Sequence, residues 1–261
     1  MVKIRDCVAL VTGASAGIGR ATAVALAQAG AKVVITARRD DRLRELAAEL
    51  ADYPGERLVL TGDIQSEAFT QTLVGETATR FGRLDVLINN AGLGHHSLLA
   101  DMPIADMRTI FDTNVFGLMA LTQTAVSLMK RQGHGHIINI SSIVSQRPLP
   151  NSGVYTASKT AVNFLSRSLR MELRRDNIRV TLVYPGLTAT EFAQARLGRK
   201  GGNRFGLKGI PPQRVARKIL HAIRYGREEV YITPTDWLFT HFCRLFPRSS
   251  DWIVNHVNNK A

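Results

Sequence analysis

The chain has few cysteines and no long apolar runs, and these absences exclude several classes of protein. Its 261 residues include only two cysteines, Cys7 and Cys243, too few for the disulfide framework of a small secreted domain. The first residues lack the apolar core of a secretory signal peptide, and no stretch approaches the roughly 20 apolar residues that span a bilayer. The sequence therefore predicts a globular protein of a reducing compartment, expected in the cytoplasm.

Acidic residues are also scarce relative to basic ones. The chain has 34 Lys and Arg against 21 Asp and Glu, a formal net charge of +13. Such an excess raises the possibility of a nucleic-acid partner, but no nucleic-acid-binding motif and no pattern of stacking aromatic residues accompanies it. Its apolar fraction of 45% is that of a globular protein, and the length suits one large α/β domain.

Short apolar or β-branched runs alternate along the chain with segments of helical periodicity. The expected strands are residues 7–12, 32–37, 57–62, 84–89, 136–141, 178–184 and 229–233. Several are almost wholly apolar, as strands buried on both faces of a parallel sheet should be. Helical segments lie between them, including two long ones at 104–131 and 153–175. This order predicts an α/β fold of Rossmann type, a doubly wound parallel sheet of about seven strands flanked by helices, with a helical tail.

The glycine-rich stretch after the first strand has two possible interpretations. Residues 13–17, Gly-Ala-Ser-Ala-Gly, fit the G-x-S-x-G elbow that presents a nucleophilic serine in hydrolases. An elbow needs an oxyanion loop from an earlier strand, and none precedes this one. The alternative uses all three glycines: Gly13 forms a tight turn, while Gly17 and Gly19 let the backbone approach a pyrophosphate at the start of a helix near Ile18. Ser15 is then part of the wall of a dinucleotide site.

Tyr155 and Lys159 are a candidate acid–base pair because residues four apart share one face of a helix. A lysine ammonium about 4 Å away would favour tyrosinate by roughly 4 kcal/mol at an effective dielectric near 20. That bounds the fall in the tyrosine pKa at about 3 units before desolvation opposes it. Tyr155 could then exchange a proton with a carbonyl oxygen, and Ser142, just past the strand 136–141, could orient that oxygen. Taken alone, the pair is also compatible with an ordinary helix face.

Six motifs in register resemble the short-chain dehydrogenase/reductase family. They are the T-G-x-x-x-G-x-G turn, NNAG at 89–92, TNVFG at 113–117, INISS at 138–142, Tyr155-x-x-x-Lys159 and YPGLTAT at 184–190. The resemblance covers about residues 5–235. It selects Ser142 over Ser141, because the family's serine precedes its tyrosine by thirteen residues, and it implies hydride transfer from the B face of nicotinamide. It also implies that Asn114 kinks its helix and holds a water in a proton relay from Lys159; a plain helix irregularity is the alternative.

The end of the second strand indicates the cofactor. Ala37 stands where a carboxylate would bind the adenosine ribose of NAD, and Arg38 and Arg39 follow it. A guanidinium would instead bind the 2′-phosphate of NADP, and one charged hydrogen bond of about 1.5–3 kcal/mol gives roughly 10- to 150-fold selectivity. A solvated helix start is the alternative interpretation of these arginines. The resemblance further implies cofactor contacts from Asp63, Ile64, Asn90, Ala91, Gly92, Tyr155, Lys159, Pro185, Gly186, Leu187 and Thr190.

Histidines offer little for a metal site. His95-His96 and His134-x-His136 are not completed by a cluster of cysteines or carboxylates, so no metal is expected. One of His95 and His96 could touch the substrate, because they follow the NNAG motif.

These features together predict an NADP-dependent oxidoreductase that transfers hydride between NADPH and a ketone or aldehyde, on a hydrophobic small molecule. The alternative is a 3-oxoacyl-carrier-protein reductase, suggested by the basic residues of a mobile lid expected at 187–210: Arg196, Arg199, Lys200, Arg204 and Lys208. A catalytically silent dinucleotide sensor and a nucleic-acid-binding protein are the alternatives from other classes. The presence of Asn114, Ser142, Tyr155 and Lys159 together favours an enzyme.

The last 26 residues, 236–261, are expected to form an amphipathic tail after a catalytic domain of residues 1–235. We expect Asp236 to cap one short helix, Pro247 to interrupt it, and Ser249 or Ser250 to cap another. Residues 192–261 carry a net charge of +9, which makes contact with an anionic membrane possible. Packing on the protein's own body, over the substrate cleft or at a dimer interface, is favoured over the membrane. The tail is rich in large apolar residues: Trp237, Leu238, Phe239, Phe242, Leu245, Phe246, Trp252, Ile253 and Val257. By resemblance, a homodimer through 104–131 and 153–175 is expected.

Overall fold

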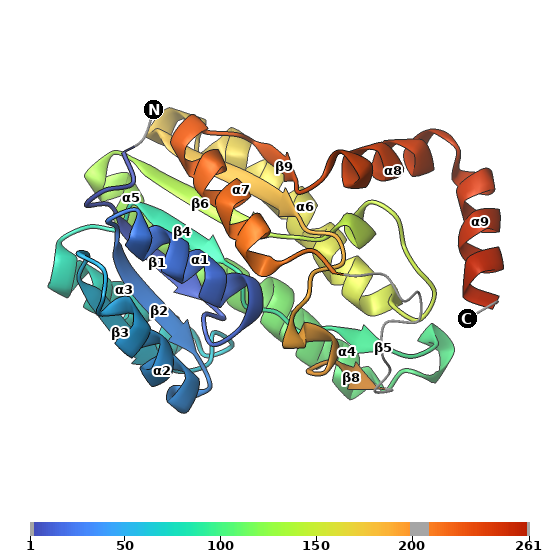
Figure 1. Ribbon diagram of the computed structural model, residues 1–261, viewed down its shortest axis with the longest axis horizontal. Helices are drawn as coiled ribbons and strands as arrows, with labels where there is room; N and C mark the ends of the chain where they lie inside the picture. The colour runs from blue at the N-terminus through green and yellow to red at the C-terminus, as the bar shows by residue number, and fades with distance from the viewer. Residues whose placement is uncertain (1–2, 199–208, 260–261) are drawn as a thin grey trace.

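The computed structural model describes residues 3–198 and 209–259 and contains one seven-stranded parallel sheet in the order β3-β2-β1-β4-β6-β7-β9 (Figure 1). Every pair of neighbouring strands in it is parallel. The strands are β1 Val8–Thr12, β2 Lys32–Ala37, β3 Arg57–Thr61, β4 Val86–Asn89, β6 Gly135–Ile140, β7 Ile178–Tyr184 and β9 Glu229–Tyr231. All seven predicted strands and the doubly wound fold are confirmed.

Helices cover both faces of this sheet. The α-helices are α1 Gly17–Gln28, α2 Asp40–Leu50, α3 Glu67–Phe81, α4 Ile104–Phe111, α5 Leu118–Gln132, α6 Gly153–Glu172, α7 Pro212–Tyr225, α8 Pro234–Leu245 and α9 Pro247–Asn259. The short helical turns are η1 Leu99–Asp101, η2 Asp112–Gly117, η3 Ile143–Ser145, η4 Arg174–Asp176 and η5 Glu191–Ala193. The apolar clusters place α1, α2 and α7 on one face and α3, α5 and α6 on the other.

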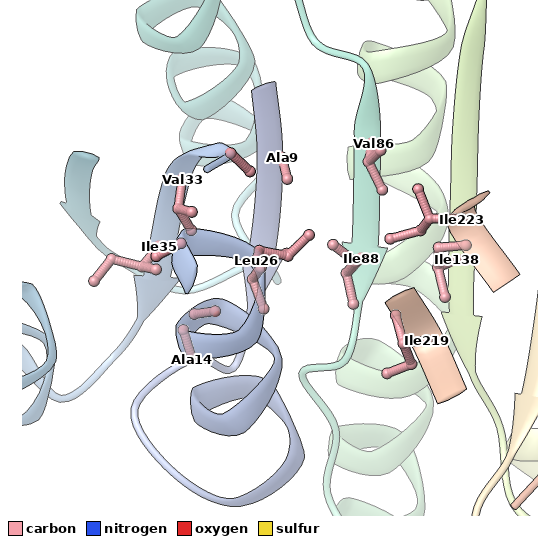
Figure 2. Packing of buried hydrophobic residues seen from close by; sticks show 14 of the residues in the cluster. Ala9, Ala14, Leu26, Val33, Ile35, Val86, Ile88, Ile138, Ile219 and Ile223 are labelled. Atoms are coloured by element: carbon pink, nitrogen blue, oxygen red, sulfur yellow. The ribbon is translucent and has the colours of Figure 1, made fainter. Parts of the chain in front are cut away.

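The core forms because the central strands are apolar on both sides. On the face shown in Figure 2, side chains from β1, β2, β4 and β6 meet Leu26 of α1 and Ile219 and Ile223 of α7. Leu26, Ile219 and Ile223 are fully buried, and burying each such side chain contributes about 1.5–3 kcal/mol. This packing fixes the carboxyl ends of β1, β4 and β6 at one edge of the sheet, where the loops that carry the motifs begin.

The long helix predicted at 104–131 is interrupted. A π-helical segment, η2, separates α4 from α5, and Gly117 at its end packs against the carbonyl of Ile64, which a Cβ there would approach to 2.8 Å. The close approach of the Ile64 loop explains why a small residue stands at this bend. The second long helix ends at Glu172, three residues earlier than expected, and η4 follows it.

Three elements were not predicted. α7 packs against α1, and the two-residue strands β5 His95–His96 and β8 Leu197–Gly198 form a separate small parallel sheet. The amide of Leu197 also donates to the Gly94 carbonyl at 3.0 Å. β5 and β8 thus attach part of the segment expected as a lid, 187–210, to the loop after β4. Residues 199–208 of that segment, with four of its five basic residues, lie outside the described residues.

The tail consists of two helices that extend from the end of β9 as an arm (Figure 1). The expected caps are wrong. Thr233 is the N-cap of α8 and forms a reciprocal capping box with Asp236 at the third position, while Ser249 and Ser250 lie inside α9, which begins at Pro247.

Most of the tail's apolar side chains do not pack on the body of this chain, so this part of the favoured expectation is wrong, while a dimer interface stays a prediction. Of the apolar tail residues predicted above, those whose side chains are described are all exposed, from 37% for Phe239 and Phe242 to 72% for Leu245. The side chain of Val257 is not among those described. No helix in residues 3–198 and 209–259 is long and apolar enough to cross a membrane.

Candidate active site

The glycine turn between β1 and α1 has no room for side chains. Gly13 and Gly17 adopt positive φ angles of 63° and 55°. A Cβ at Gly13 would lie 2.8 Å from Ala91 Cα, and one at Gly19 would collide with the Gly13 carbonyl oxygen. These positions therefore require glycine both for backbone conformation and for close packing.

The loop after β4 is tied to this turn by side-chain hydrogen bonds. Thr12 Oγ1 accepts from the amides of Asn90 and Ala91, each at 2.9 Å. Asn90 Nδ2 donates to the carbonyls of Thr12 and Gly13 at 2.9 and 3.2 Å. The Asn90 side chain thus holds the glycine turn against the loop after β4. The sequence did not predict this structural role for Asn90 or for Thr12.

The turn fits a dinucleotide phosphate. The N-cap of α1, Ala16, offers no side-chain acceptor to the amides of the first helical turn. Unpaired amides and the positive end of the helix dipole are what a pyrophosphate binds. The space that a Cβ would fill at Gly17 is bordered by Thr190 Cγ2, at 3.0 Å, so the loop after β7 lies over the same turn.

Two arginines stand beside the cradle at the end of β2. Arg39 donates to Ser15 Oγ through Nε and Nη2 at 3.3 and 3.2 Å, and to the Glu191 carboxylate through Nη1 at 3.1 Å. Arg38 points elsewhere, with its Nη1 3.7 Å from the carboxylate of Asp63. Arg39 therefore faces the glycine turn and Arg38 faces the loop after β3, where Ile64 is buried.

Ser142 and Tyr155 meet at the carboxyl edge of the sheet. Ser142 follows β6, where its Oγ donates to the Pro185 carbonyl at 3.4 Å and shares a hydrogen bond with Tyr155 from the first turn of α6. Burial raises the pKa of Tyr155 to about 12, and the hydrogen bond with Ser142 offsets part of that rise. The serine–tyrosine pair predicted from the motif spacing is brought together.

Lys159 lies one turn further along α6, and the pKa of Tyr155 is raised by burial despite this neighbour. Its Nζ donates to the Ile140 carbonyl at 2.8 Å, and its side chain is 4% exposed. Burial lowers the pKa of Lys159 to about 8, because removal from water disfavours the ammonium. The expected electrostatic effect of lysine on tyrosine is therefore outweighed by desolvation of both groups.

Asn114 holds the π-helical bend against the loop after β4. Its Nδ2 donates to the Leu93 carbonyl and to Ser158 Oγ, both at 2.9 Å, and its Oδ1 accepts from the Leu93 amide at 2.7 Å. A Cβ at Gly92 would lie 3.1 Å from Asn114 Oδ1 and 3.4 Å from Lys159 Nζ. The predicted kink is present, and the lack of a side chain at Gly92 lets both the asparagine and the lysine approach the loop after β4; the water relay stays a prediction.

The segment after β7 closes the site from the other side. The Pro185 carbonyl accepts from the amide of Ile143 at 3.1 Å, and a Cβ at Gly186 would lie 2.6 Å from the Asp236 carboxylate. Leu187 is exposed. The first turn of the tail therefore packs on the segment that the resemblance places at the cofactor carboxamide.

Two residues beside the reacting groups were not predicted. Phe192 lies against Tyr155 with ring centroids 5.6 Å apart, and the lack of a side chain at Gly94 makes room for it, because a Cβ there would be 2.9 Å from Phe192 Cε1. Both lie in loops whose contacts depend on the whole fold, so no local pattern could identify them. Phe192 therefore lies directly beside the Tyr155 phenol.

Two of the histidines have hydrogen-bond partners within the chain, and contact of His95 or His96 with the substrate stays a prediction. His95 is buried and contacts Asp106 Oδ2 through Nε2 at 3.3 Å, while His136 pairs with Thr181 Oγ1 at 2.8 Å. Among the described side chains, no group of three or more His, Cys, Asp and Glu is placed to hold a metal ion.

Comparison with known proteins agrees with this geometry. The family model described as short chain dehydrogenase matches residues 7–200. Sulfoacetaldehyde reductase 2 of Chromohalobacter salexigens is 38% identical over 193 residues, 73% of this chain and 76% of that protein. A short-chain dehydrogenase/reductase from Burkholderia phymatum in complex with NAD has a TM-score of 0.87 at 26% identity, covering 96% of this chain and 97% of its own. An alcohol dehydrogenase from Thermococcus sibiricus, complexed with 5-hydroxy-NADP, has a TM-score of 0.78 at 28% identity over 87% and 96%.

Proposed function

We propose that this chain, which belongs to the short-chain dehydrogenase/reductase family of oxidoreductases, transfers hydride between NADPH and a ketone or aldehyde. The observation that carries the proposal is the convergence of Ser142, Tyr155 and Lys159 beside a glycine turn fitted for a dinucleotide phosphate. The cofactor, when bound, supplies the hydride.

The chain's own groups then perform the proton chemistry. Ser142 Oγ donates to the carbonyl oxygen and holds it beside Tyr155, whose phenol delivers the proton. Lys159 binds the cofactor ribose, and Asn114 fixes the loop and bend that hold Lys159 in place. A positioned general acid of this kind accelerates a reaction about 10²- to 10⁴-fold.

Preference for NADP is supported by the residues at the end of β2. The strand ends in Ala37 and not in a carboxylate residue, and Arg39 faces the glycine turn. The solved relatives bind either NAD or an NADP analogue, so the preference is argued from these side chains and not from the family.

The substrate we favour is a hydrophobic carbonyl compound. Phe192 provides apolar surface next to Tyr155, Leu187 is exposed in the segment after β7, and the aromatic arm begins beside Gly186. The second candidate, reduction of carrier-linked 3-oxoacyl chains, rests on basic residues of which only Arg196 is described. An anionic aldehyde belongs among the substrates tested, because a relative is a sulfoacetaldehyde reductase.

We also propose a homodimer through α5 and α6. Phe116 at the start of this surface, and Phe164 and Met171 on α6, are 63%, 66% and 74% exposed in the single chain. Large apolar side chains that are exposed to water on the surface of a helix indicate a protein interface. The proposed partners are therefore a second copy of this chain and a small-molecule substrate. The exposed arm is the surface on which binding to an anionic membrane would be tested.

The proposed reaction is tested by replacing Tyr155 with phenylalanine. Turnover is measured as NADPH oxidation with ketones, steroids, retinoids, oxoacyl thioesters and an anionic aldehyde, and NADPH binding is measured separately by fluorescence. We expect turnover to fall by about 10²- to 10⁴-fold while binding persists. Turnover retained in Tyr155→Phe would disprove the assignment.

A further inference from the structure

One short turn reaches across both ends of the candidate site. Glu191 and Phe192 are neighbours on η5: the Glu191 carboxylate accepts from Arg39 Nη1 at 3.1 Å, and the Phe192 ring lies against Tyr155. Thr190, directly before them, lies against the glycine turn at Gly17. η5 and Thr190 therefore lie over both the glycine turn after β1 and the Tyr155 phenol. The Arg39–Glu191 ion pair links η5 to the end of β2.

The corner around Arg39 already contains an anion. Arg39 uses Nε and Nη2 on Ser15 and Nη1 on the Glu191 carboxylate. Carboxylate and phosphate oxygens are bound by a guanidinium in the same way, through charge-assisted hydrogen bonds from its planar fork. A nucleotide 2′-phosphate at this corner would need the donor that Glu191 now occupies.

We propose that Glu191 is a specificity-tuning residue that competes with the cofactor's 2′-phosphate for Arg39. Its carboxylate weakens the binding of nucleotides that carry this phosphate and leaves the binding of those without it unchanged. The inference rests on the proposed NADP dependence, because it acts only through a phosphate that Arg39 binds. The proposal makes Glu191, from the loop after β7, a determinant of cofactor preference in addition to the two arginines at the end of β2.

The expected effect is small because the pair is in contact with water. The side chains of Arg39 and Glu191 are 47% and 52% exposed. Ion pairs with this exposure contribute modestly, and the corresponding change in a dissociation constant is about 1.5- to 5-fold. Removing the carboxylate should therefore improve binding of the phosphorylated nucleotide within that range.

The test uses two small probes and needs no catalysis. Adenosine 2′,5′-bisphosphate and adenosine 5′-monophosphate differ only in the 2′-phosphate, and calorimetry gives the dissociation constant of each for the full-length protein. We expect Glu191→Gln to tighten binding of the bisphosphate by about 1.5- to 5-fold and to leave the monophosphate unchanged. Arg39→Ala should weaken the bisphosphate alone, and adding Glu191→Gln to Arg39→Ala should then have no further effect.

A matched control separates competition from a general change of charge. Glu45→Gln removes the same charge from an exposed glutamate of α2 that pairs with Arg42. Equal tightening by Glu45→Gln and Glu191→Gln would overturn the proposal, as would an unchanged bisphosphate affinity in Glu191→Gln when Arg39→Ala does weaken it. If Arg39→Ala leaves both probes unchanged, then Arg39 does not bind the phosphate and the role of Glu191 fails; the proposed NADP preference fails with it if Arg38→Ala also leaves both probes unchanged.

Discussion

Replacing Lys159 with methionine is expected to stabilise the folded protein at neutral pH while removing its proposed activity. Burial lowers the pKa of Lys159 from 10.5 to about 8. At 1.36 kcal/mol per pKa unit, keeping this group protonated in the folded state costs about 3 kcal/mol. Methionine has a similar length and no charge, but it leaves the Ile140 carbonyl without its donor, at a cost of about 1–3 kcal/mol. The expected net gain in unfolding free energy is on the order of 1 kcal/mol.

The pH dependence gives the sharper test of the same reasoning. Below about pH 8 the lysine is protonated in both the folded and the unfolded chain, so its cost is fully present. Between pH 8 and 10.5 the unfolded chain still holds the proton that the folded chain has lost from Lys159, and the contribution of this group to the stability of the wild type therefore rises with pH. The variant lacks this rise, so its advantage should shrink as the pH increases.

Urea unfolding of both proteins at intervals from pH 7 to pH 10 measures this difference. The Tyr155 pKa is raised from 10 to about 12, so the folded protein holds that proton longer and its contribution falls only above pH 10, outside the titration. Lys218→Met, at an exposed position on α7, is the matched control, and its difference from the wild type should stay constant. Stabilities of wild type and Lys159→Met that run parallel from pH 7 to pH 10 would refute the argument from burial.

Three further outcomes are expected. Arg38→Ala and Arg39→Ala should each raise the KM for NADPH more than that for NADH, with the larger effect, about 10-fold, at Arg39; equal effects on the two cofactors would mean that neither arginine reads the phosphate. Gly94→Ala places a Cβ 2.9 Å from the Phe192 ring, so it should raise the KM for the carbonyl substrate while NADPH affinity, measured by fluorescence, stays constant. Truncation after Thr235 removes the Asp236 contact with the segment after β7, and it should change the oligomeric state, liposome binding or turnover. If the truncated protein is unchanged in all three measurements, the tail has none of the proposed roles.

The parts of the fold that the sequence predicted depend on local signals. Strands buried on both faces are continuous apolar runs, so their positions were visible to within two residues. The glycines at 13 and 17 are fixed by positive φ angles, and Tyr155 and Lys159 by helix periodicity. These features depend on residues close together in the sequence. Because the motifs follow the strands of a parallel sheet, the fold brings them to the same edge.

What the sequence could not show depends on contacts between distant segments. Glu191 and Phe192 gain their partners, Arg39 and Tyr155, only when the loop after β7 folds over the turn after β1. The cap of α8 was misassigned because Thr233 and Asp236 are both good capping residues, and the backbone decides which one precedes the helix. The electrostatic effect of Lys159 on the Tyr155 pKa was bounded before desolvation, and the burial of Tyr155 that outweighs it arises from contacts between distant segments.

The state of Tyr155 bears on the direction of the proposed reaction. Burial raises the pKa of Tyr155 to about 12, so the phenol is protonated at neutral pH. Carbonyl reduction uses the protonated form directly, since hydride addition to the carbonyl carbon turns the carbonyl oxygen into an alkoxide, which is a stronger base than phenolate. Alcohol oxidation needs the phenolate, and the Lys159 ammonium that could favour it is held on the Ile140 carbonyl. We infer that Tyr155 of the free protein carries the proton that carbonyl reduction needs near neutral pH. The rate of alcohol oxidation should therefore increase relative to the rate of reduction as the pH rises.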